Sequence, residues 1–522
     1  MGRRPFQLAR TRLTLFDALL RAKAAFGGRT KVLEDPERKL LSYTDIVRAS
    51  FALGGRLKGL TAKGEAVGVL LPSSAGCAVT ILALHAIGRV PAMLNFTAGA
   101  LNLKSACESA QVRRVLTSRK FVELGKLEHL IAEIEKFAEI TYLDDIKARI
   151  GFGEKMGALI KGAFAKSFAA KGDPDDTAVI LFTSGSFGSP RGVALTHANI
   201  IANVEQAYAH VDFDPEWVFF NPLPMFHCFG LTGGTLLPLL CGHRAFHYPS
   251  PLHFKEIPKL LREVGANVLL ATDTFAMQYA RMSRKGELDC LKLIVLGAER
   301  VKPETRDIYM EKFGVELLEG YGATEASPVV AVNQPGAGNR HGSVGRILPG
   351  MEYKLEEVPG ITEGKKLLLK GPNIMKGYID PSKPSGIDAP VDGWHDTGDV
   401  VEIDAEGFVK IRGRVKRFAK IGGETVSLAA VENYAQQVWP EHNHAAVSIP
   451  DARKGEKIIL FSDYANAEPG PLIEWAHKQG APEIAVPKKI VKLSEIPVLG
   501  TGKTDYVALI RMAEQSDHAE AA

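Results

Sequence analysis

The segment from Leu181 to Val193, L-F-T-S-G-S-F-G-S-P-R-G-V, contains the residue types that bind phosphate groups. It follows an apolar run over 177–182 and combines three glycines, several hydroxyl side chains and one cation, Arg191. Because glycine lets the backbone turn sharply and approach a ligand, the N–H groups of such a loop can converge on an anion. The pattern favours a loop for nucleotide phosphates, although a Gly/Ser-rich surface turn has the same composition.

A second polar segment, L-L-E-G-Y-G-A-T-E over 317–325, follows another apolar run. Tyr321 could stack on a purine, Thr324 could bond a phosphate, and Glu325 could hold Mg²⁺ against phosphate oxygens. A third segment, G-W-H-D-T-G-D over 393–399, presents carboxylates. Because a carboxylate only accepts hydrogen bonds, Asp399 could bind both hydroxyls of a ribose.

Two further glycine-containing segments lie near the end of the chain. Gly413 and Arg414 begin a dense basic run that extends to residue 420, and P-V-L-G-T-G-K-T over 497–504 contains Lys503. The last segment resembles a Walker A loop but has proline at position 497, where that motif needs glycine. Too little chain follows it to form the fold that a Walker A loop requires.

The bulk composition excludes several classes of protein. The chain has 522 residues, and its 64 basic and 60 acidic residues leave a net charge of +4, which is too balanced for a dedicated nucleic-acid binder. Five dispersed cysteines without a C-x-x-C pair argue against a disulfide framework or a structural zinc site, and fit a reducing cytosol. The longest apolar stretches, 66–71 and 230–241, are shorter than the ~20 residues that span a bilayer. We therefore expect a cytoplasmic protein with at most peripheral contact at the inner face of a membrane.

Apolar runs alternate with helical patterns through the first 340 residues. This alternation predicts an α/β fold with parallel sheets and helices on their faces. The predicted strands include 66–71, 90–94, 112–117, 178–182, 268–270, 293–296 and 315–318, and the predicted helices include 77–87 and 101–109. Shorter alternating strands after Gly342 predict a β-rich subdomain, and 150–172 is expected to be a mobile loop. We predict a large domain over 1–412 and a small, mobile α+β lid over 413–522.

Taken in order, the polar segments resemble the motifs of the adenylate-forming superfamily, which includes acyl-CoA and acyl-ACP synthetases, luciferases and the adenylation domains of peptide synthetases. The first loop is similar to T-S-G-[TS]-T-G-x-P-K-G, with Phe187 replacing the second hydroxyl and Arg191 replacing lysine. Y-G-A-T-E and H-D-T-G-D resemble the next two motifs, G-R-V-K (413–416) resembles the hinge motif, and G-T-G-K resembles the final lysine motif. The resemblance extends over nearly the whole chain.

Several segments look more specifically like the synthetase half of the bifunctional acyl-ACP synthetase/2-acylglycerophosphoethanolamine acyltransferase. They are L-P-G-M-E-Y-K-L-E-E-V-P-G-I (348–361), L-K-G-P-N-I-M-K-G-Y (369–378), G-R-V-K-R-F-A-K-I-G-G-E (413–424) and I-P-V-L-G-T-G-K-T-D (496–505). The chain has no H-x-x-x-x-D acyltransferase signature. We therefore expect the synthetase chemistry without the acyltransferase chemistry.

The resemblance implies a reaction in two halves that requires ATP and Mg²⁺. A fatty carboxylate would attack the α-phosphate of ATP to give acyl-AMP and pyrophosphate, and a pantetheine thiol would then displace AMP. Lys503 would bridge the carboxylate and the α-phosphate, Glu325 and Thr183 would ligate Mg²⁺, and Asp399 would hold the ribose with help from Arg414. The ATP-binding residues implied in total are Thr183, Ser184, Gly185, Ser186, Gly188, Arg191, Gly297, Ala298, Glu299, Tyr321, Gly322, Thr324, Asp399, Ile411 and Arg414.

The resemblance also implies an acyl site and a moving lid. His227 and Phe229, in L-P-M-F-H-C-F-G (223–230), would line the carboxylate pocket, although a core aromatic cluster would read the same way. The lid would pivot at Lys416 between the two half-reactions, bringing Gly422 and Gly423 to the pantetheine arm. Position 417 is usually Asp in the family and is Arg here, a departure that we interpret as a mark of the subfamily.

The sequence does not determine which molecule accepts the acyl group. We prefer acyl carrier protein, which the basic run from Lys410 could steer electrostatically unless that run is only a solvated face. Coenzyme A is the alternative acceptor. In a third possibility, the enzyme makes only acyl-AMP and transfers it to another protein. A separate lysophospholipid acyltransferase would be a further partner. A non-catalytic nucleotide-binding scaffold is the alternative of another class, and the presence of Lys503, Glu325 and Asp399 argues against it.

Overall fold

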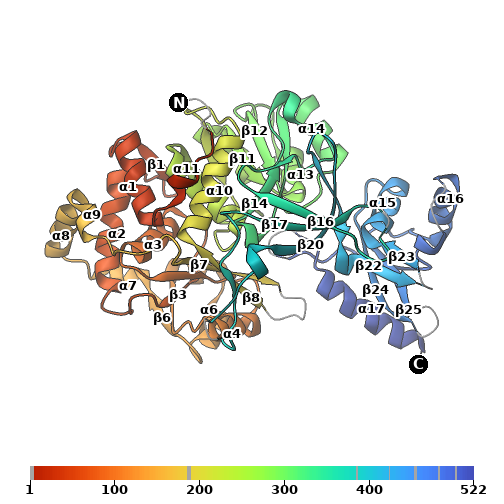
Figure 1. Ribbon diagram of the computed structural model, residues 1–522, viewed down its shortest axis with the longest axis horizontal. Helices are drawn as coiled ribbons and strands as arrows, with labels where there is room; N and C mark the ends of the chain where they lie inside the picture. Colours follow the sequence, from red (N-terminus) through yellow and green to blue (C-terminus); the bar gives the residue numbers. More distant parts are fainter. Residues whose placement is uncertain are drawn as a thin grey trace. The chain divides into compact units, whose positions relative to one another are not determined.

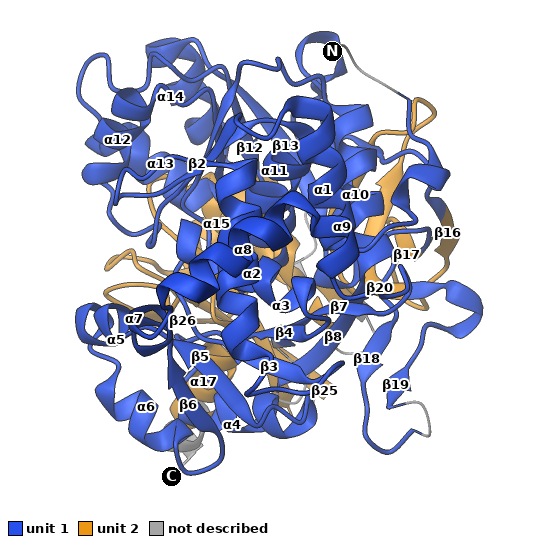
Figure 2. Cartoon of the chain, turned by 90° about the vertical axis from the view of Figure 1, so that its left-hand side faces the viewer, with its two compact units in different colours: residues 1–352, 370–395 blue, residues 353–369, 396–522 orange. Residues whose placement is uncertain are grey.

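The computed structural model describes residues 5–184, 190–361, 363–383, 386–421, 424–451, 455–479, 483–499 and 503–521. The chain forms two compact units, each built from separate stretches of sequence (Figure 2). Unit 1 comprises Met1–Glu352 and Lys370–His395, and unit 2 comprises Tyr353–Leu369 and Asp396–Ala522. This division differs from the predicted boundary at residue 412, because the four-stranded sheet β16-β17-β20-β21, whose strands all begin before that position, belongs mostly to unit 2.

The first sheet of unit 1 has eight strands in the order β19-β18-β8-β7-β4-β3-β5-β6. Five of them, β3 to β7, pair in parallel, and β8, β18 and β19 continue the sheet in antiparallel fashion. The sheet is therefore mixed, with the predicted parallel part on one side. Its strands are β3 (Ala66–Val69), β4 (Val90–Met93), β5 (Arg114–Thr117), β6 (Glu139–Tyr142), β7 (Thr177–Ser184), β8 (Pro190–Thr196), β18 (Gly377–Ile379) and β19 (Ile387–Asp388).

The second sheet of unit 1 has nine strands in the order β15-β14-β13-β12-β11-β9-β10-β1-β2. Its central strands are parallel, whereas β2, β14 and β15 pair antiparallel at the two edges. Its strands are β1 (Lys31–Glu34), β2 (Leu41–Ser42), β9 (Val218–Asn221), β10 (Arg244–His247), β11 (Val268–Ala271), β12 (Leu293–Leu296), β13 (Glu316–Gly322), β14 (Val329–Val332) and β15 (Arg346–Ile347).

Helices cover both sheets of unit 1 (Figure 1). The largest apolar core contains residues of both sheets and of α3, whose side chains are buried almost throughout. The α-helices of unit 1 are α1 (Leu15–Phe26), α2 (Tyr43–Leu57), α3 (Ala75–Ala86), α4 (Ala100–Ser109), α5 (Arg119–Gly125), α6 (Glu128–Ile134), α7 (Leu143–Ala148), α8 (Phe152–Ala163), α9 (Ala165–Phe168), α10 (His197–His210), α11 (Leu237–Cys241), α12 (Glu256–Val264), α13 (Asp273–Met282) and α14 (Pro303–Phe313).

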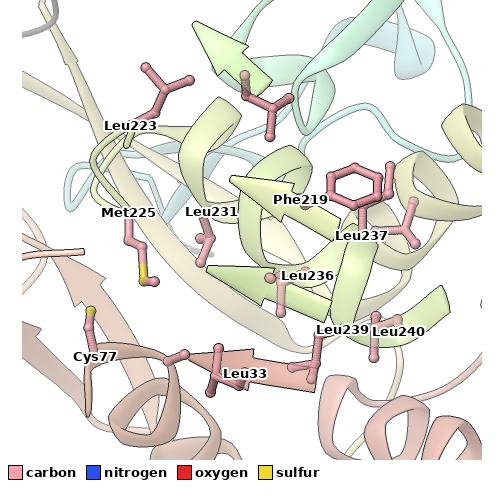
Figure 3. Packing of buried hydrophobic residues seen from close by; sticks show 14 of the residues in the cluster. Leu33, Cys77, Phe219, Leu223, Met225, Leu231, Leu236, Leu237, Leu239 and Leu240 are labelled. Carbon is pink, nitrogen blue, oxygen red and sulfur yellow. The ribbon is translucent and has the colours of Figure 1, made fainter. Parts of the chain in front are cut away.

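A π-helix, η2 (Phe229–Leu236), continues directly into α11 and inserts a row of leucines into this core. Figure 3 shows Leu231, Leu236 and Leu239 among the buried side chains of β1 and β9. Two glycines allow the tight packing of η2: a Cβ at Gly230 would lie 2.3 Å from the carbonyl oxygen of Pro224, and one at Gly234 would lie 2.2 Å from Asn221. π-Helical turns are rare and are often found at functional sites.

Unit 2 is an α+β structure. Its own sheet has the order β23-β22-β25-β24, with β26 paired to β25. Alternate residues of β24 and β25 bury against α15 and α16 on one face and against α17 on the other, as their period of two requires. Its elements are β16 (Glu352–Glu356), β17 (Lys365–Lys370), β20 (His395–Ile403), β21 (Val409–Arg414), β22 (Phe418–Ile421), β23 (Glu424–Ser427), α15 (Leu428–Val438), β24 (His444–Asp451), β25 (Gly455–Ser462), α16 (Pro469–Gln479), β26 (Lys489–Lys492) and α17 (Tyr506–Ala521).

The predicted loop over 150–172 is wrong, because the structure has two helices there, α8 and α9. The glycines of this segment lower its helix propensity, but tertiary contacts compensate for that loss. A Cβ at Gly162 would lie 2.9 Å from the side chain of Arg48, so this glycine permits close packing of α8 against α2. Within the described residues, no helix is both long and apolar enough to cross a membrane.

Candidate active site

The hairpin of β7 and β8 carries the ends of the predicted phosphate loop. Thr183 is the register partner of Arg191, and Ser184 is the partner of Pro190. Thr183 is half-buried and Arg191 is exposed, so the hairpin presents a hydroxyl and a cation on opposite strands. The predicted phosphate ligands between them, Gly185, Ser186 and Gly188, lie outside the described residues.

Arg191 is linked to Glu325 through a tyrosine that the sequence analysis does not single out. The guanidinium of Arg191 lies over the ring of Tyr378, 3.5 Å from its centroid. The Tyr378 hydroxyl donates a hydrogen bond of 2.8 Å to Oε1 of Glu325. The three residues come from β8, β18 and the short helix η3 (Thr324–Ala326), so the fold brings a cation, an aromatic ring and a carboxylate to one place.

Backbone hydrogen bonds hold the Glu325 segment in position. The N–H of Met375 donates to the carbonyl of Glu325 at 2.8 Å, and Nδ2 of Asn373 donates to the carbonyl of Ala326 at 2.8 Å. The next residue along, Lys376, donates its N–H to the carbonyl of Ala194 in β8 at 3.0 Å. The segment before Tyr378 therefore binds η3 on one side and β8 on the other.

Tyr321 and Gly322 end β13, and η3 begins two residues later at Thr324. Tyr321 is half-buried and Gly322 is exposed. A Cβ at position 322 would lie 2.5 Å from the carbonyl oxygen of Pro328, which is closer than real Cβ contacts allow. The glycine between the aromatic residue and the hydroxyl is thus required by the backbone crossing at Pro328.

The three residues after β12 have separate roles. A Cβ at Gly297 would lie 3.3 Å from Cε1 of Phe229, so the fold brings these two predicted site residues together. Ala298 has a φ of 72°, a left-handed conformation that costs a non-glycine residue about 1–2 kcal/mol. The Glu299 carboxylate accepts the N–H of Thr274 at 3.0 Å, at the start of α13. Glu299 is therefore committed to a helix terminus in this structure.

His227 and Phe229 lie where the chain enters η2. The N–H of Leu231 donates to the carbonyl of His227 at 2.9 Å, and the His227 ring lies 4.9 Å from that of Phe226. Burial raises the pKa of the Cys228 thiol, which lies between them, to about 12, and the charge of Glu325 adds to the shift. A thiol with such a pKa stays protonated at neutral pH, so Cys228 is not an activated nucleophile.

A narrow apolar gap, too small to hold a water molecule, lies between α3 and the η2–α11 helix. Its lining is apolar except for Thr235 and consists of Ala78, Ile81, Leu82, Leu231, Thr235, Leu236 and Leu239. The gap begins two residues beyond Phe229 in sequence. It is the kind of space that an alkyl chain could widen without leaving a polar group unpaired.

Asp399 and Arg414 form an ion pair in unit 2. They are register partners in β20 and β21, and Nε of Arg414 donates to Oδ1 of Asp399 at 2.9 Å. Asp399 is 3% exposed, whereas Arg414 is exposed. Ile411 lies in β21 opposite Val401. The two strands therefore place the predicted ribose ligand beside its predicted assistant.

The basic run after residue 410 is not a uniformly solvated face. Arg412 pairs with Glu402 at 2.7 Å, Arg414 pairs with Asp399, and Arg417 pairs with Glu432 at 2.8 Å. The exposed cations of the run are Lys410, Arg414, Lys416 and Lys420. Lys416, the predicted hinge residue, lies in the short helix η6 (Val415–Arg417), and Gly422 and Gly423 lie outside the described residues.

Arg417 belongs to a cluster that connects η6 to α15 and α17. Its guanidinium lies 3.7 Å from the centroid of the Tyr506 ring, and the Tyr506 hydroxyl donates to Oε1 of Glu432 at 3.0 Å. Burial, reinforced by the charge of Glu432, raises the pKa of Tyr506 to about 12. Arginine at this position, where the family usually has Asp, therefore has a structural partner in this chain.

Lys503 lies on the loop that precedes α17. The N–H of Leu499 donates to the carbonyl of Lys503 at 2.7 Å, and Val498 forms an isolated bridge with Thr504. Lys503 is exposed. The position of this lysine three residues before Tyr506 places its loop next in sequence to the Arg417 cluster.

Residues 20–379 match the family model described as AMP-binding enzyme. The chain belongs to the AMP-binding enzyme family. The predicted family resemblance is thereby confirmed, and the matched region contains the whole Arg191–Tyr378–Glu325 cluster.

Curated relatives of this AMP-binding enzyme include fatty-acid ligases. The long-chain-fatty-acid–CoA ligase of Salmonella typhimurium is 30% identical over 347 residues, which cover 63% of this chain and 60% of that protein. The medium-chain fatty-acid–CoA ligase of Escherichia coli is 29% identical over 345 residues, with the same coverage. The chain thus spans about 60% of the length of these relatives. A feruloyl-CoA synthase from Amycolatopsis is 26% identical and covers 89% of this chain and 92% of its own length.

Solved structures confirm the predicted α/β fold with a C-terminal domain. The anthranilate CoA ligase AuaEII in complex with anthranoyl-AMP superposes with a TM-score of 0.81 at 19% identity, covering 98% of this chain and all of that one. ATP-bound MatB from Rhodopseudomonas palustris gives a TM-score of 0.81 at 23% identity, covering 95% and 98% of the two chains.

The residues available for Mg²⁺ in this AMP-binding enzyme fit that ion. Glu325 offers a carboxylate and Thr183 a hydroxyl, both hard oxygen donors. The part of the chain that the structure describes has no group of three or more His, Cys, Asp or Glu side chains arranged for a metal. Because Mg²⁺ is usually held by one or two carboxylates together with substrate phosphates and water, a sparse donor set suits it.

Proposed function

We propose that this AMP-binding enzyme is an AMP-forming acid–thiol ligase that activates a fatty acid with ATP. The observation that carries the proposal is the Arg191–Tyr378–Glu325 cluster, which lies inside the matched family region and beside the phosphate-loop hairpin. It combines a cation for phosphate oxygens with a carboxylate for a phosphate-bound divalent ion. The fatty-acid–CoA ligases among the relatives support the same reaction.

In the first half-reaction, a fatty carboxylate oxygen attacks the α-phosphorus of ATP, and the bond to the pyrophosphate leaving group breaks. Both reactants are anions, so positioning and charge stabilisation dominate the barrier. Arg191 and the loop over 183–188 would bind the β- and γ-phosphates, and Lys503 would bind the oxygens on which charge develops. Mg²⁺, held by Glu325 and Thr183, would neutralise phosphate charge when bound. Asp399 would accept the ribose hydroxyls, with Arg414 fixing its orientation.

The fatty acid would bind along η2. Phe229 lies against Gly297, and His227 is half-buried at the same turn, so both can line the carboxylate end of an acyl site. The apolar gap between α3 and η2–α11 continues from there and is lined almost entirely by apolar side chains. An alkyl chain would occupy it if the π-helix shifts on binding.

In the second half-reaction, a pantetheine thiol attacks the acyl carbonyl and AMP leaves. The lid would pivot at Lys416, and Gly422 and Gly423 would approach the pantetheine arm. We propose coenzyme A as the acceptor, because the relatives are CoA ligases. Acyl carrier protein is a second candidate, supported by the segments similar to acyl-ACP synthetase and by the exposed lysines at 410, 416 and 420. A separate lysophospholipid acyltransferase would then consume the acyl-carrier product.

Fatty-acid-dependent exchange of pyrophosphate into ATP tests the proposal. We expect exchange with at least one acid in the C8–C18 range, and its absence with all of them would overturn the enzyme function. Assays with coenzyme A and with holo-acyl carrier protein then assign the acceptor. A protein that forms acyl-AMP but transfers to neither thiol would support the version that stops at the adenylate.

The variant Lys503→Ala separates the half-reactions. We expect it to reduce exchange by about 10³-fold, since a lost stabilising group at a developing charge typically costs that much. Transfer from supplied acyl-AMP to the thiol should remain. An equal loss of both half-reactions would contradict the role proposed for Lys503.

A further inference from the structure

Helices α8 and α9 expose a continuous apolar face. Phe152, Met156 and Ile160 recur every four residues along α8, so they lie on one side of the helix. Phe152 is 80% exposed, Ile160 is 55% exposed, and Phe164, at the junction with α9, is 64% exposed. The exposed large apolar residues of the segment are Phe152, Met156, Leu159, Ile160, Phe164 and Phe168. We call these six residues the α8–α9 face.

The opposite side of α8 is firmly held by unit 1. Ala158 and Gly162 are buried, and Nζ of Lys23 donates to the carbonyl of Gly162 at 3.3 Å. Arg56 of α2 pairs with Glu154 at 2.5 Å, and Glu154 also accepts the N–H of Gly151 at 2.9 Å. These contacts fix which side of the helix points outward. The exposed apolar face is therefore a consequence of the packing and not of a loose segment.

The face lies at the edge of unit 1. Figure 1 shows α8 and α9 at the left-hand margin, and Figure 2, turned by 90°, shows α8 in front of α2. In both views, no other drawn helix or strand of unit 1 lies over the outward side of α8. A contiguous exposed patch of this kind usually marks an interaction surface.

The charges around the face select the type of partner. Four lysines, Lys155, Lys161, Lys166 and Lys171, are distributed through the segment. Its one carboxylate between 150 and 172, Glu154, is neutralised by Arg56. The acids that follow, Asp173 and Asp175, pair with Arg12. The segment thus combines an exposed apolar face with four lysines, three of which are exposed.

We propose that the α8–α9 face docks this protein on an anionic lipid bilayer. Apolar side chains on an amphipathic helix insert to the boundary of the headgroups and acyl chains, and flanking lysines extend to the lipid phosphates. Large aromatic and aliphatic residues at four-residue spacing, with lysine as the only unpaired charge type in the segment, match this mode. Docking is independent of the proposed ligase activity, because it requires neither ATP nor the active-site residues.

Co-sedimentation of the full chain with vesicles tests the proposal. We expect binding to vesicles of phosphatidylcholine and phosphatidylglycerol in equal parts, and at least tenfold weaker binding to phosphatidylcholine alone. Raised salt should weaken the binding, because the lysine contribution is screened. Equal binding to both vesicles, or binding to neither, would overturn the proposal.

A set of serine substitutions tests whether vesicle binding depends on the α8–α9 face or on exposed apolar residues in general. The variant with Phe152→Ser, Met156→Ser, Ile160→Ser and Phe164→Ser should bind the anionic vesicles at least tenfold more weakly. The matched control replaces four exposed apolar residues elsewhere in unit 1, Leu101→Ser, Leu124→Ser, Leu252→Ser and Val391→Ser, and should bind like the unmodified protein. A similar loss in both variants would refute a role specific to the α8–α9 face.

Lysine substitutions test the contribution of the four lysines in the same way. Lys155→Gln, Lys161→Gln, Lys166→Gln and Lys171→Gln together should abolish the preference for anionic vesicles. The control set of exposed lysines, Lys58→Gln, Lys63→Gln, Lys126→Gln and Lys285→Gln, removes the same charge and should keep that preference. If both sets lose it equally, only net charge matters and the proposed site is wrong.

A fluorescence measurement covers the event that the serine variant does not fold. Brominated lipids in the anionic vesicles should quench a larger fraction of the tryptophan emission in Phe152→Trp than in the unmodified protein. In Leu101→Trp the quenched fraction should not exceed that of the unmodified protein. Quenching at both positions, or at neither, would contradict insertion of this face. Analytical ultracentrifugation of the same proteins provides the remaining distinction, because self-association through the face without vesicle binding would identify a second copy as the occupant and overturn the proposal.

Discussion

The same three residue types, Arg, Tyr and Glu, form a cluster in each unit of this AMP-binding enzyme, but the arginine and the glutamate form an ion pair in only one of the two clusters. In unit 2, Arg417 lies over Tyr506 and also pairs with Glu432, so all three members contact one another. In unit 1, Arg191 lies over Tyr378 and Tyr378 donates to Glu325, but no salt bridge joins Arg191 to Glu325. We call the first cluster closed, because its arginine and glutamate pair with each other, and the second open, because they do not.

Burial explains the difference between the clusters. The side chains of Arg417 and Glu432 are 21% and 19% exposed, and the Glu432 carboxylate also accepts the N–H of Ala446 at 2.8 Å. Arg191 is exposed and Glu325 is half-buried. A closed cluster uses its charges to join secondary-structure elements, whereas an open one keeps donor and acceptor capacity for a ligand. We therefore expect substitutions in the two clusters to affect different properties.

The largest expected effect is on catalysis by the open cluster. Glu325→Gln should reduce fatty-acid-dependent exchange by about 10²–10³-fold, the usual loss when a group that stabilises transition-state charge is removed. Thermal unfolding should change little, because Glu325 is only half-buried. Glu432→Gln is the matched change in the closed cluster. A greater loss of exchange in Glu432→Gln than in Glu325→Gln would contradict the comparison.

The next effect is on the stability of unit 2. Glu432→Gln leaves the guanidinium of Arg417 without its anion, which should destabilise unit 2 by about 2–3 kcal/mol, below the range for a fully buried pair because Arg417 retains some exposure. Hydrogen exchange followed by mass spectrometry should show faster exchange in peptides of α15 and α17, while peptides of unit 1 keep their protection. Unchanged protection in α15 and α17 would show that the closed cluster does not hold these helices.

Removal of the two tyrosine hydroxyls should give smaller effects of different kinds. Tyr378→Phe keeps the ring under Arg191 but releases Glu325, and we expect about tenfold slower exchange, equivalent to ~1.4 kcal/mol. Tyr506→Phe removes a hydrogen bond to a charged group and should cost about 1.5 kcal/mol of stability in unit 2. The same two assays measure both variants. A stability loss in Tyr378→Phe with normal exchange would make the open cluster structural as well.

The smallest expected effect per residue is a loss of stability at lower pH, which should be larger in unit 1 than in unit 2. Burial lowers the pKa of His85 and His243 to about 4 and that of His197 and His247 to about 3, and all four belong to unit 1. Since the unfolded imidazole has a pKa of 6.5, the unfolded state takes up the protons first. The folded state therefore keeps its full free energy of unfolding above pH 6.5 and loses part of it as the pH falls below that value. The loss is less than about 1 kcal/mol per imidazole between pH 7 and pH 6.

The buried carboxyls of Asp35, Asp273 and Glu319 oppose this loss, because burial raises the pKa of each, that of Asp273 to about 6. The balance still favours acid destabilisation of unit 1, because the four imidazoles outnumber these three carboxyls. Hydrogen exchange at pH 7 and pH 6, corrected for the intrinsic rates, should show loss of protection in unit 1 peptides and little change in unit 2. Equal losses in both units would mean that these histidines do not determine the acid response.

Much of the secondary structure was predictable from local sequence pattern. The predicted strands at 66–71, 90–94 and 293–296 correspond to β3, β4 and β12, because each is a short apolar run bounded by turn residues. The helices at 150–172 were missed, since five glycines and a row of exposed apolar residues do not resemble a packed helix. The antiparallel edges of both large sheets were also missed, because strand order depends on contacts between distant segments.

The candidate site shows the same division. Thr183, Arg191, Glu325 and Asp399 are predicted from the sequence, because each lies in a short motif with glycines at fixed spacing. Tyr378 was not found, although it ends the quoted K-G-Y segment, since its role depends on reaching two residues 53 and 187 positions away. The contact of the Glu299 carboxylate with the start of α13 was also not predictable, because it joins segments 25 positions apart.

The sequence by itself determined the family, the order of its motifs and the residue types available for phosphate, ribose and acyl binding. These properties depend on short spacings, which a linear chain contains in full. Only the tertiary structure decided that Arg191 is open and Arg417 closed, and that α8 turns its apolar side outward. The physical reason is that burial and charge pairing depend on which distant segments come into contact, and no local pattern contains that information.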